Sequence, residues 1–179
     1  MGLPGSQRSI QRLVDEHYQA LYRYAYRLSG SAADADDLTQ DTFCKAQMRL
    51  EQLREPARAK AWLFSILRNT YLHRMRERRN ETVSLDGVGE LPGPAPDPLP
   101  DVEPEQLQQA LQELPEVFRT PIILYYFEDF SYREIAEQME LPLGTVMSRL
   151  ARAKAYLRSR LAPAEQGPSA RDRRAANGL

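Results

Sequence analysis

The chain of 179 residues has little of what secreted and membrane proteins carry. It contains a single cysteine, Cys44, so no intramolecular disulfide can form, which fits a reducing cytosol. The first twelve residues lack the apolar core of a signal peptide, and no run approaches the roughly 18 apolar residues of a membrane span. We therefore expect a soluble, cytoplasmic protein without membrane insertion.

The sequence also has few of the patterns that carry catalysis. It has no glycine-rich phosphate loop and no Ser/His/Asp arrangement, and its two histidines lie in different predicted helices. Four aspartates crowd one segment, and carboxylates can hold a metal or act as acid and base; they are Asp34, Asp36, Asp37 and Asp41. No matching His or Glu pattern accompanies them, so we expect a solvated face or protein-docking patch, with no metal, cofactor or catalysis. An enzyme that uses this cluster is the alternative. Cys44 is expected to be an inert thiol in or near the buried stripe of its helix.

A formal net charge of −1 hides an uneven distribution of charge. Residues 68–79 and 149–160 are basic blocks, whereas residues 81–103 carry six acidic side chains and no basic one. The near-neutral average thus hides a polar arrangement of charge along the chain.

Apolar residues recur at helical spacing along most of the chain, and no strand pattern is present, which predicts an all-α fold. Ser31 followed by Asp34, and Ser131 followed by Glu134, are typical of helix starts, and Pro115 is expected at a first helical position. The expected helical segments are 10–28, 31–50, 59–79, 104–114 and the stretch from 115 to about 127, followed by a helical pair over 131–161.

Residues 81–103 are rich in proline, glycine and acidic residues and cannot bury a core, which predicts a flexible linker. The linker divides the chain into two small helical domains, 10–80 and 104–162. Residues 1–9 and 163–179 are expected to be disordered ends.

The segment 131–161 has the layout of a helix-turn-helix, whose second helix lies in the DNA major groove. Glu140 stands in the turn, where such motifs often have glycine. The second helix repeats Val146, Leu150, Ala153 and Leu157 on one face and carries arginines on the other. An ordinary amphipathic hairpin with a solvated basic face is the alternative.

The segment 59–79 begins with apolar and aromatic residues and ends in arginines. Positive charge beside planar side chains is the combination that single-stranded DNA binding uses. Two DNA-facing surfaces on two small domains suggest contact with two DNA segments a fixed distance apart.

Three stretches together resemble an extracytoplasmic-function (ECF) sigma factor of the sigma-70 family. They are DADDLTQDTFCKA, KAWLFSILRNTYLHRMRERR and the run from LPEVFRT through SYREIAEQMELPLGTVMSRLARAKAYLR. The resemblance covers about residues 10–161 and leaves out the linker and both ends. It implies a promoter-specificity subunit that binds core RNA polymerase and has no catalytic activity of its own.

The resemblance also assigns roles to positions. Docking on the polymerase clamp coiled coil falls on Asp37, Leu38, Gln40, Asp41 and Phe43. Opening of the promoter −10 element falls on the loop 51–58 and the helix after it, at Arg58, Trp62, Arg68, Asn69, Tyr71, Arg74 and Arg76. Reading of the −35 element falls on Arg133, Thr145, Met147, Ser148, Arg149, Arg152 and Lys154.

The partners that the resemblance implies are core RNA polymerase (clamp coiled coil and flap), promoter DNA and an anti-sigma factor. Many family members have arginine where Met147 stands and a bulky residue where Ala151 stands, which leaves the −35 sequence open. A stand-alone helix-turn-helix regulator is the rival; it would bind its operator tightly without polymerase.

Overall fold

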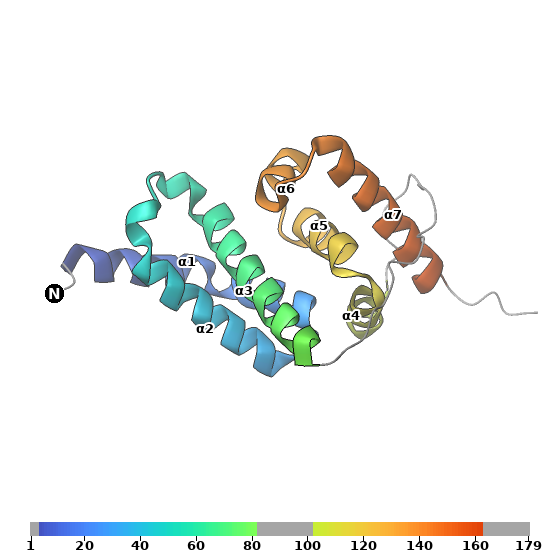
Figure 1. Ribbon diagram of the computed structural model, residues 1–179, viewed down its shortest axis with the longest axis horizontal. Helices are drawn as coiled ribbons and strands as arrows, with labels where there is room; N and C mark the ends of the chain where they lie inside the picture. The colour runs from blue at the N-terminus through green and yellow to red at the C-terminus, as the bar shows by residue number, and fades with distance from the viewer. Residues whose placement is uncertain (1–3, 82–101, 163–179) are drawn as a thin grey trace, which may run out of the picture.

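The computed structural model describes residues 4–81 and 102–162, which form two helical regions (Figure 1). The predicted all-α fold is confirmed. The predicted linker and C-terminal tail fall almost wholly outside the described residues. The elements in chain order are α1 (Pro4–Ser29), α2 (Ala32–Met48), the 3₁₀ turns η1 (Leu50–Gln52) and η2 (Pro56–Arg58), α3 (Ala59–Glu81), α4 (Pro104–Glu113), α5 (Glu116–Phe127), α6 (Tyr132–Met139) and α7 (Leu143–Leu161).

The first domain is the three-helix unit α1–α3, in which each helix packs on the other two. Gly30 separates α1 from α2 with φ of +73°, a conformation that favours glycine. Ser31 then caps α2, its side chain accepting a hydrogen bond from the Asp34 amide at 3.2 Å, as predicted.

Three details of this domain differ from the sequence-based predictions. Helix α1 begins at Pro4 rather than Ile10, since adding turns to an existing helix costs little. Helix α2 ends at Met48, and Leu50 already belongs to η1. Cys44 is exposed rather than part of the core, because the buried side of α2 is formed by Ala35, Leu38, Thr39, Thr42, Phe43 and Ala46.

The second domain is the four-helix unit α4–α7, in which α7 packs on α4, α5 and α6. Pro115 is the N-cap of α5, not its first helical residue, so this prediction was one position off. Phe118, Ile122 and Leu124 line the buried side of α5.

Helix α6 is closed at both ends by backbone and side-chain hydrogen bonds. The Ser131 amide donates to Glu134 at 2.8 Å and the Glu134 amide donates to Ser131 Oγ at 3.3 Å, which confirms the predicted capping box. At the other end, Glu140 adopts φ of +53°. Its amide donates to the Glu137 carbonyl at 3.3 Å and the Leu141 amide to the Ala136 carbonyl at 3.0 Å. This is a Schellman motif with glutamate in the position that glycine usually occupies.

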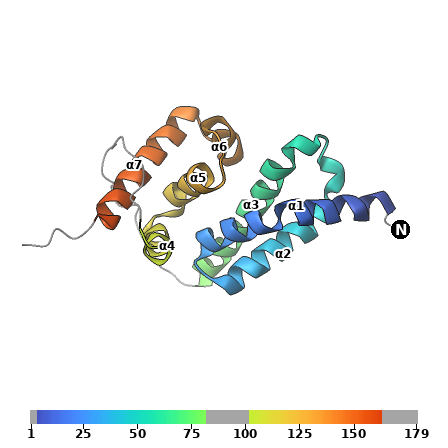
Figure 2. The ribbon, with the colours of Figure 1, turned by 180° about the vertical axis from the view of Figure 1, so that it is seen from behind.

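The two domains lie against each other, as the front and back views show (Figures 1 and 2). Helix α1 contacts α4 and α5, and α3 contacts α6. Aromatic rings continue from one domain into the other: Tyr24 stacks on Phe64 at 4.9 Å, and Phe64 meets Phe130 at 5.2 Å. In the described residues the two domains are therefore in contact, and one apolar core runs through both. We call this the closed arrangement.

Candidate nucleic-acid and polymerase interfaces

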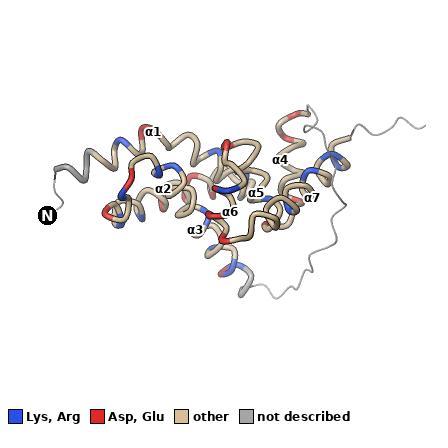
Figure 3. The backbone as a smooth tube through the Cα atoms, turned by 90° about the horizontal axis from the view of Figure 1, so that it is seen from above, with Lys and Arg blue, Asp and Glu red and all other residues tan. Residues whose placement is uncertain are grey.

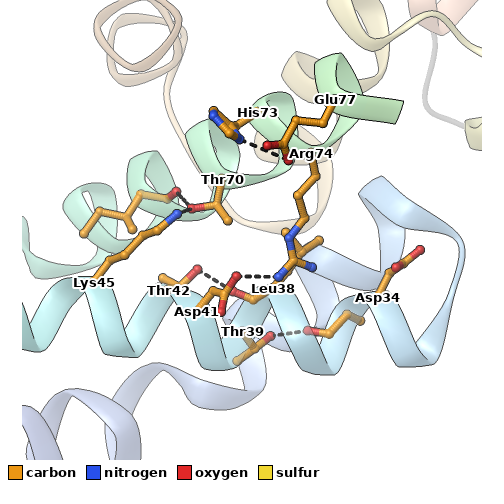
Figure 4. Close-up of polar contacts among 12 residues, drawn as sticks. Asp34, Leu38, Thr39, Asp41, Thr42, Lys45, Thr70, His73, Arg74 and Glu77 are labelled. Atoms are coloured by element: carbon orange, nitrogen blue, oxygen red, sulfur yellow. Dashed lines mark hydrogen bonds and ion pairs between the residues drawn. The ribbon is translucent and has the colours of Figure 1, made fainter. Parts of the chain in front are cut away.

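The acidic surface of α2 consists of open residues and of residues paired with α3. Asp37 and Gln40 are exposed. Asp41 lies one turn beyond Asp37 and accepts a hydrogen bond from Arg74 of α3 (Figure 4). The open carboxylates give this face its negative charge, and the ion pair fixes α2 against α3.

The two apolar residues of the predicted docking set belong to the core. Leu38 is 1% exposed and Phe43 is 9% exposed. The Phe43 ring stacks on Tyr18 of α1 at 6.3 Å. In this conformation Leu38 and Phe43 hold the acidic face in place and offer little surface to a partner.

The C-terminal half of α3 presents some predicted DNA-binding residues and buries one. Asn69 and Arg76 are exposed, and Arg74 is held by Asp41. Tyr71 is 5% exposed, its hydroxyl donates to the Leu28 carbonyl at 3.1 Å, and burial raises its pKa. Tyr71 therefore anchors α3 to the end of α1 in the closed chain and is not available to a base.

The start of α3 and the loop before it face the second domain. Arg68 Nε lies 3.7 Å from a carboxylate oxygen of Glu116, and Arg58 lies 3.6 Å from Glu137. Trp62 borders a surface hollow of about 580 Å³ between this loop and α6. Arg58, Trp62 and Arg68, three of the predicted −10 residues, thus lie at or beside the contact between the domains. They cannot all reach DNA while the two domains are in contact.

Arg119 of α5 holds the closed arrangement through backbone carbonyls. Its Nη1 donates to the Leu28 carbonyl of α1 at 2.7 Å and to the Tyr71 hydroxyl at 3.3 Å. Its Nη2 donates to the Leu114 carbonyl at 2.8 Å. Gln112 adds a bond to the Arg27 carbonyl at 2.8 Å. The second domain thus adds hydrogen bonds to the last carbonyls of α1, which have no partner inside the helix.

Glu128, at the end of α5, is a buried carboxylate in the same contact. Its side chain is 2% exposed, and one of its oxygens, Oε1, lies 3.9 Å from Arg27 but has no hydrogen-bond partner. Burial raises the pKa of Glu128 to about 7, against the opposing attraction of Arg27, Arg23 and Lys60. Lys60 also donates to the Glu128 backbone carbonyl.

Sequence reasoning missed Arg119 and Glu128. The only signal was their position: both flank the apolar run of α5, where a charged residue must find a partner or stay at an edge. That signal does not say that the partner lies in the other domain.

The second helix of the helix-turn-helix is the most open of the predicted surfaces. Met147, Ser148 and Arg152 are exposed on α7, and Arg133 is exposed on α6. Thr145, Arg149 and Lys154 are half-buried. Val146 and Leu150 fill the opposite side of the helix, at 0% and 5% exposure. The backbone coloured by charge shows basic positions along α7 (Figure 3). The geometry can present polar and cationic side chains to a groove.

Two further findings concern the described residues. No group of three His, Cys, Asp or Glu side chains in ranges 4–81 and 102–162 could hold a metal ion. Over those same ranges, no helix combines the length and the hydropathy that a membrane crossing requires.

Two family descriptions match the chain, one on each domain. Residues 13–81 match sigma-70 region 2, and residues 104–157 match sigma-70 region 4. Together they cover the predicted −10 and −35 surfaces, in that order.

Curated proteins that are similar to this chain include ECF sigma factors. The ECF RNA polymerase sigma factor SigE of Mycolicibacterium smegmatis is 38% identical over 86% of this chain, which spans 62% of that protein. SigL of Mycobacterium tuberculosis, also an ECF sigma factor, is 34% identical, with 88% of this chain and 92% of that protein covered.

Among structures, the sigma factor RpoE of Bartonella quintana, in complex with the anti-sigma factor NepR, matches with a TM-score of 0.72. It is 30% identical and covers 86% of this chain and 97% of that one. CnrH, in complex with the cytosolic domain of CnrY, matches with a TM-score of 0.62 at 28% identity, with 86% of this chain and 87% of that one covered.

Proposed function

Because the chain belongs to the ECF RNA polymerase sigma factors, we propose that it binds core RNA polymerase and directs it to specific promoters. It does so in the cytoplasm and catalyses no reaction itself. The observation that carries the proposal is the order of the two matched regions on two domains, the second of which presents an open basic helix.

The exposure of individual residues supports the following assignment of roles. Asp37, Gln40 and Asp41 of α2 dock on the polymerase, and Leu38 and Phe43 position that face from behind. The exposed Arg133, Ser148 and Arg152, with Arg149 and Lys154 at the edge, contact the −35 element. An arginine that is bidentate to guanine supplies about 1–3 kcal/mol of discrimination, which specifies a site but does not bind it alone.

Opening of the −10 element is assigned to α3 and the loop before it. Asn69 and Arg76 are exposed on its accessible part, and Arg74 reaches DNA only by leaving its ion pair with Asp41. Unstacking bases costs a few kcal/mol, which contacts to the separated strand must offset. Arg58, Trp62 and Arg68 take part only after the second domain has moved away, because they lie at or beside the contact between the domains.

The closed arrangement therefore describes the free chain, and polymerase separates the domains. Core polymerase holds both domains at positions that match the two promoter elements, which raises their effective concentration on DNA. An anti-sigma factor would act by keeping the domains from these positions. One structure to which the chain is similar, the sigma factor RpoE of Bartonella quintana, is a complex with an anti-sigma factor.

Promoter binding with and without core polymerase tests the proposal against the stand-alone regulator. A fluorescent promoter duplex is titrated with the chain alone and with the chain loaded on core polymerase. We expect specific binding only with polymerase, and its loss in Asp37→Arg. Tight, sequence-specific binding by the chain alone, unchanged by polymerase, would favour the regulator.

A further inference from the structure

Met147 is an exposed apolar side chain in the middle of a polar, basic helix face. It is 50% exposed. Ser148, Ala151 and Arg152 follow it at one, four and five positions, so the four residues share one side of α7. Ala151 is half-buried and small, which leaves the methionine open to whatever this side contacts.

Packing within the second domain does not explain why position 147 carries an apolar side chain. The side of α7 that faces α4–α6 is complete without it, filled by Val146, Leu150 and residues in register with them. Leu143 is similarly exposed, at 46%, but precedes Val146 by three positions and Leu150 by seven. Leu143 therefore extends the buried stripe at the start of the helix, whereas Met147 lies beside Ser148 and Arg152.

The charged residues near Met147 indicate which kind of partner would contact it. Arg133, Arg149 and Arg152 lie on the same helix pair and favour a polyanion over an apolar protein partner. Among the base edges in the major groove, the one apolar group is the C5 methyl of thymine. A thioether donates no hydrogen bond, so methionine cannot take the role of an arginine at guanine.

We propose that Met147, with Ala151 beside it, recognises the C5 methyl group of one thymine in the −35 element. This inference rests on the proposed function, since it needs α7 in the major groove of a promoter. It makes Met147 a specificity-determining residue alongside the arginines, one that discriminates by apolar contact.

The test uses the full chain loaded on core polymerase and promoter duplexes with a randomised −35 element. We expect the wild type to enrich thymine at one position at least, and Met147→Ala to relax the preference there alone. Deoxyuridine, which differs from thymidine only by that methyl group, then replaces the enriched base. We expect this to weaken wild-type binding about fourfold, the value of one buried methyl-sized group of about 0.8 kcal/mol, and to leave Met147→Ala unaffected.

Leu143→Ala is the matched control and should keep the full sensitivity to deoxyuridine. The inference is overturned if no −35 thymine is enriched, or if deoxyuridine has the same effect on wild type and on Met147→Ala. Sequence preference that is lost in Arg152→Ala, with no effect of the methyl group, would contradict only this inference. Absence of any promoter-specific binding would contradict the proposed function as well.

Discussion

The buried carboxylate of Glu128 makes the closed arrangement depend on pH. The pKa of Glu128 is raised to about 7 in the folded chain from an ordinary value of 4.5, because burial disfavours its charged form. A carboxyl whose folded pKa is raised binds its proton more tightly when folded, so its contribution to stability is largest at low pH. This contribution falls as the pH rises from about 4.5 to 7 and is constant above that.

The size of the effect follows from the shift. Each pKa unit corresponds to 1.36 kcal/mol, so a shift of about 2.5 units corresponds to about 3 kcal/mol between pH 4 and pH 8. The charged groups that act on Glu128 from the first domain are Arg27, Arg23 and Lys60, and from its own segment Asp129. Because Arg27 and Lys60 lie against Glu128, separating the domains exposes it to water and removes the cost.

Energy transfer between dyes on the two domains measures the separation. The exposed Cys44 of α2 takes one dye and Ser159→Cys on α7 takes the other. Urea is added at several pH values until the dyes separate. We expect the wild-type midpoint to fall as the pH rises towards 7, and Glu128→Gln to lose this fall because glutamine stays neutral.

The control is Glu137→Gln, which removes an exposed carboxylate at the same contact between the domains. It should leave the wild-type pH profile in place. Other groups that titrate in this range, such as the half-buried His17, are common to both chains and cancel in the difference between wild type and Glu128→Gln. Parallel profiles for wild type and Glu128→Gln would refute the reasoning.

Further predictions concern the turn, the docking face and the two DNA surfaces. Glu140→Gly should stabilise the chain by about 1 kcal/mol in urea unfolding, because glycine adopts φ of +53° without strain; a loss of stability would contradict this. Asp37→Arg should abolish binding to core polymerase in a pull-down assay, whereas Asp15→Arg, the same charge reversal on α1, should bind normally. Arg149→Ala should relax sequence preference in the −35 element by about one bidentate contact, or 1–3 kcal/mol. Equal losses on all −35 variants would make Arg149 a phosphate contact. Arg76→Ala should instead weaken binding evenly and reduce its salt dependence, measured between 50 and about 200 mM salt.

Local patterns in the sequence predicted the local structure well. The Ser131–Glu134 capping box and the burial of Val146 depend on residues a few positions apart, and both are confirmed. Buried threonines were harder to predict. Thr39 and Thr42 enter the core because their hydroxyls donate to carbonyls four residues earlier, both at 2.7 Å (Figure 4). With two threonines in the buried side of α2, Cys44 falls outside it.

Contacts between the domains could not be predicted from such patterns. Tyr71 and Arg68 lie within two positions of the exposed Asn69, yet each has a partner in the second domain, Arg119 for Tyr71 and Glu116 for Arg68. Arg119 binds a carbonyl 91 positions away along the chain. The roles assigned to the individual DNA-binding and polymerase-binding residues stay predictions.

Run-off transcription with purified core RNA polymerase tests the central claim most directly. Promoter fragments from the source genome are transcribed with core enzyme alone, with this chain and with a housekeeping sigma factor. We expect transcripts from a specific set of promoters when this chain is added, and their loss in Asp37→Arg. If the chain supports no promoter-specific transcript while the housekeeping sigma factor works on its own promoters, the account is contradicted.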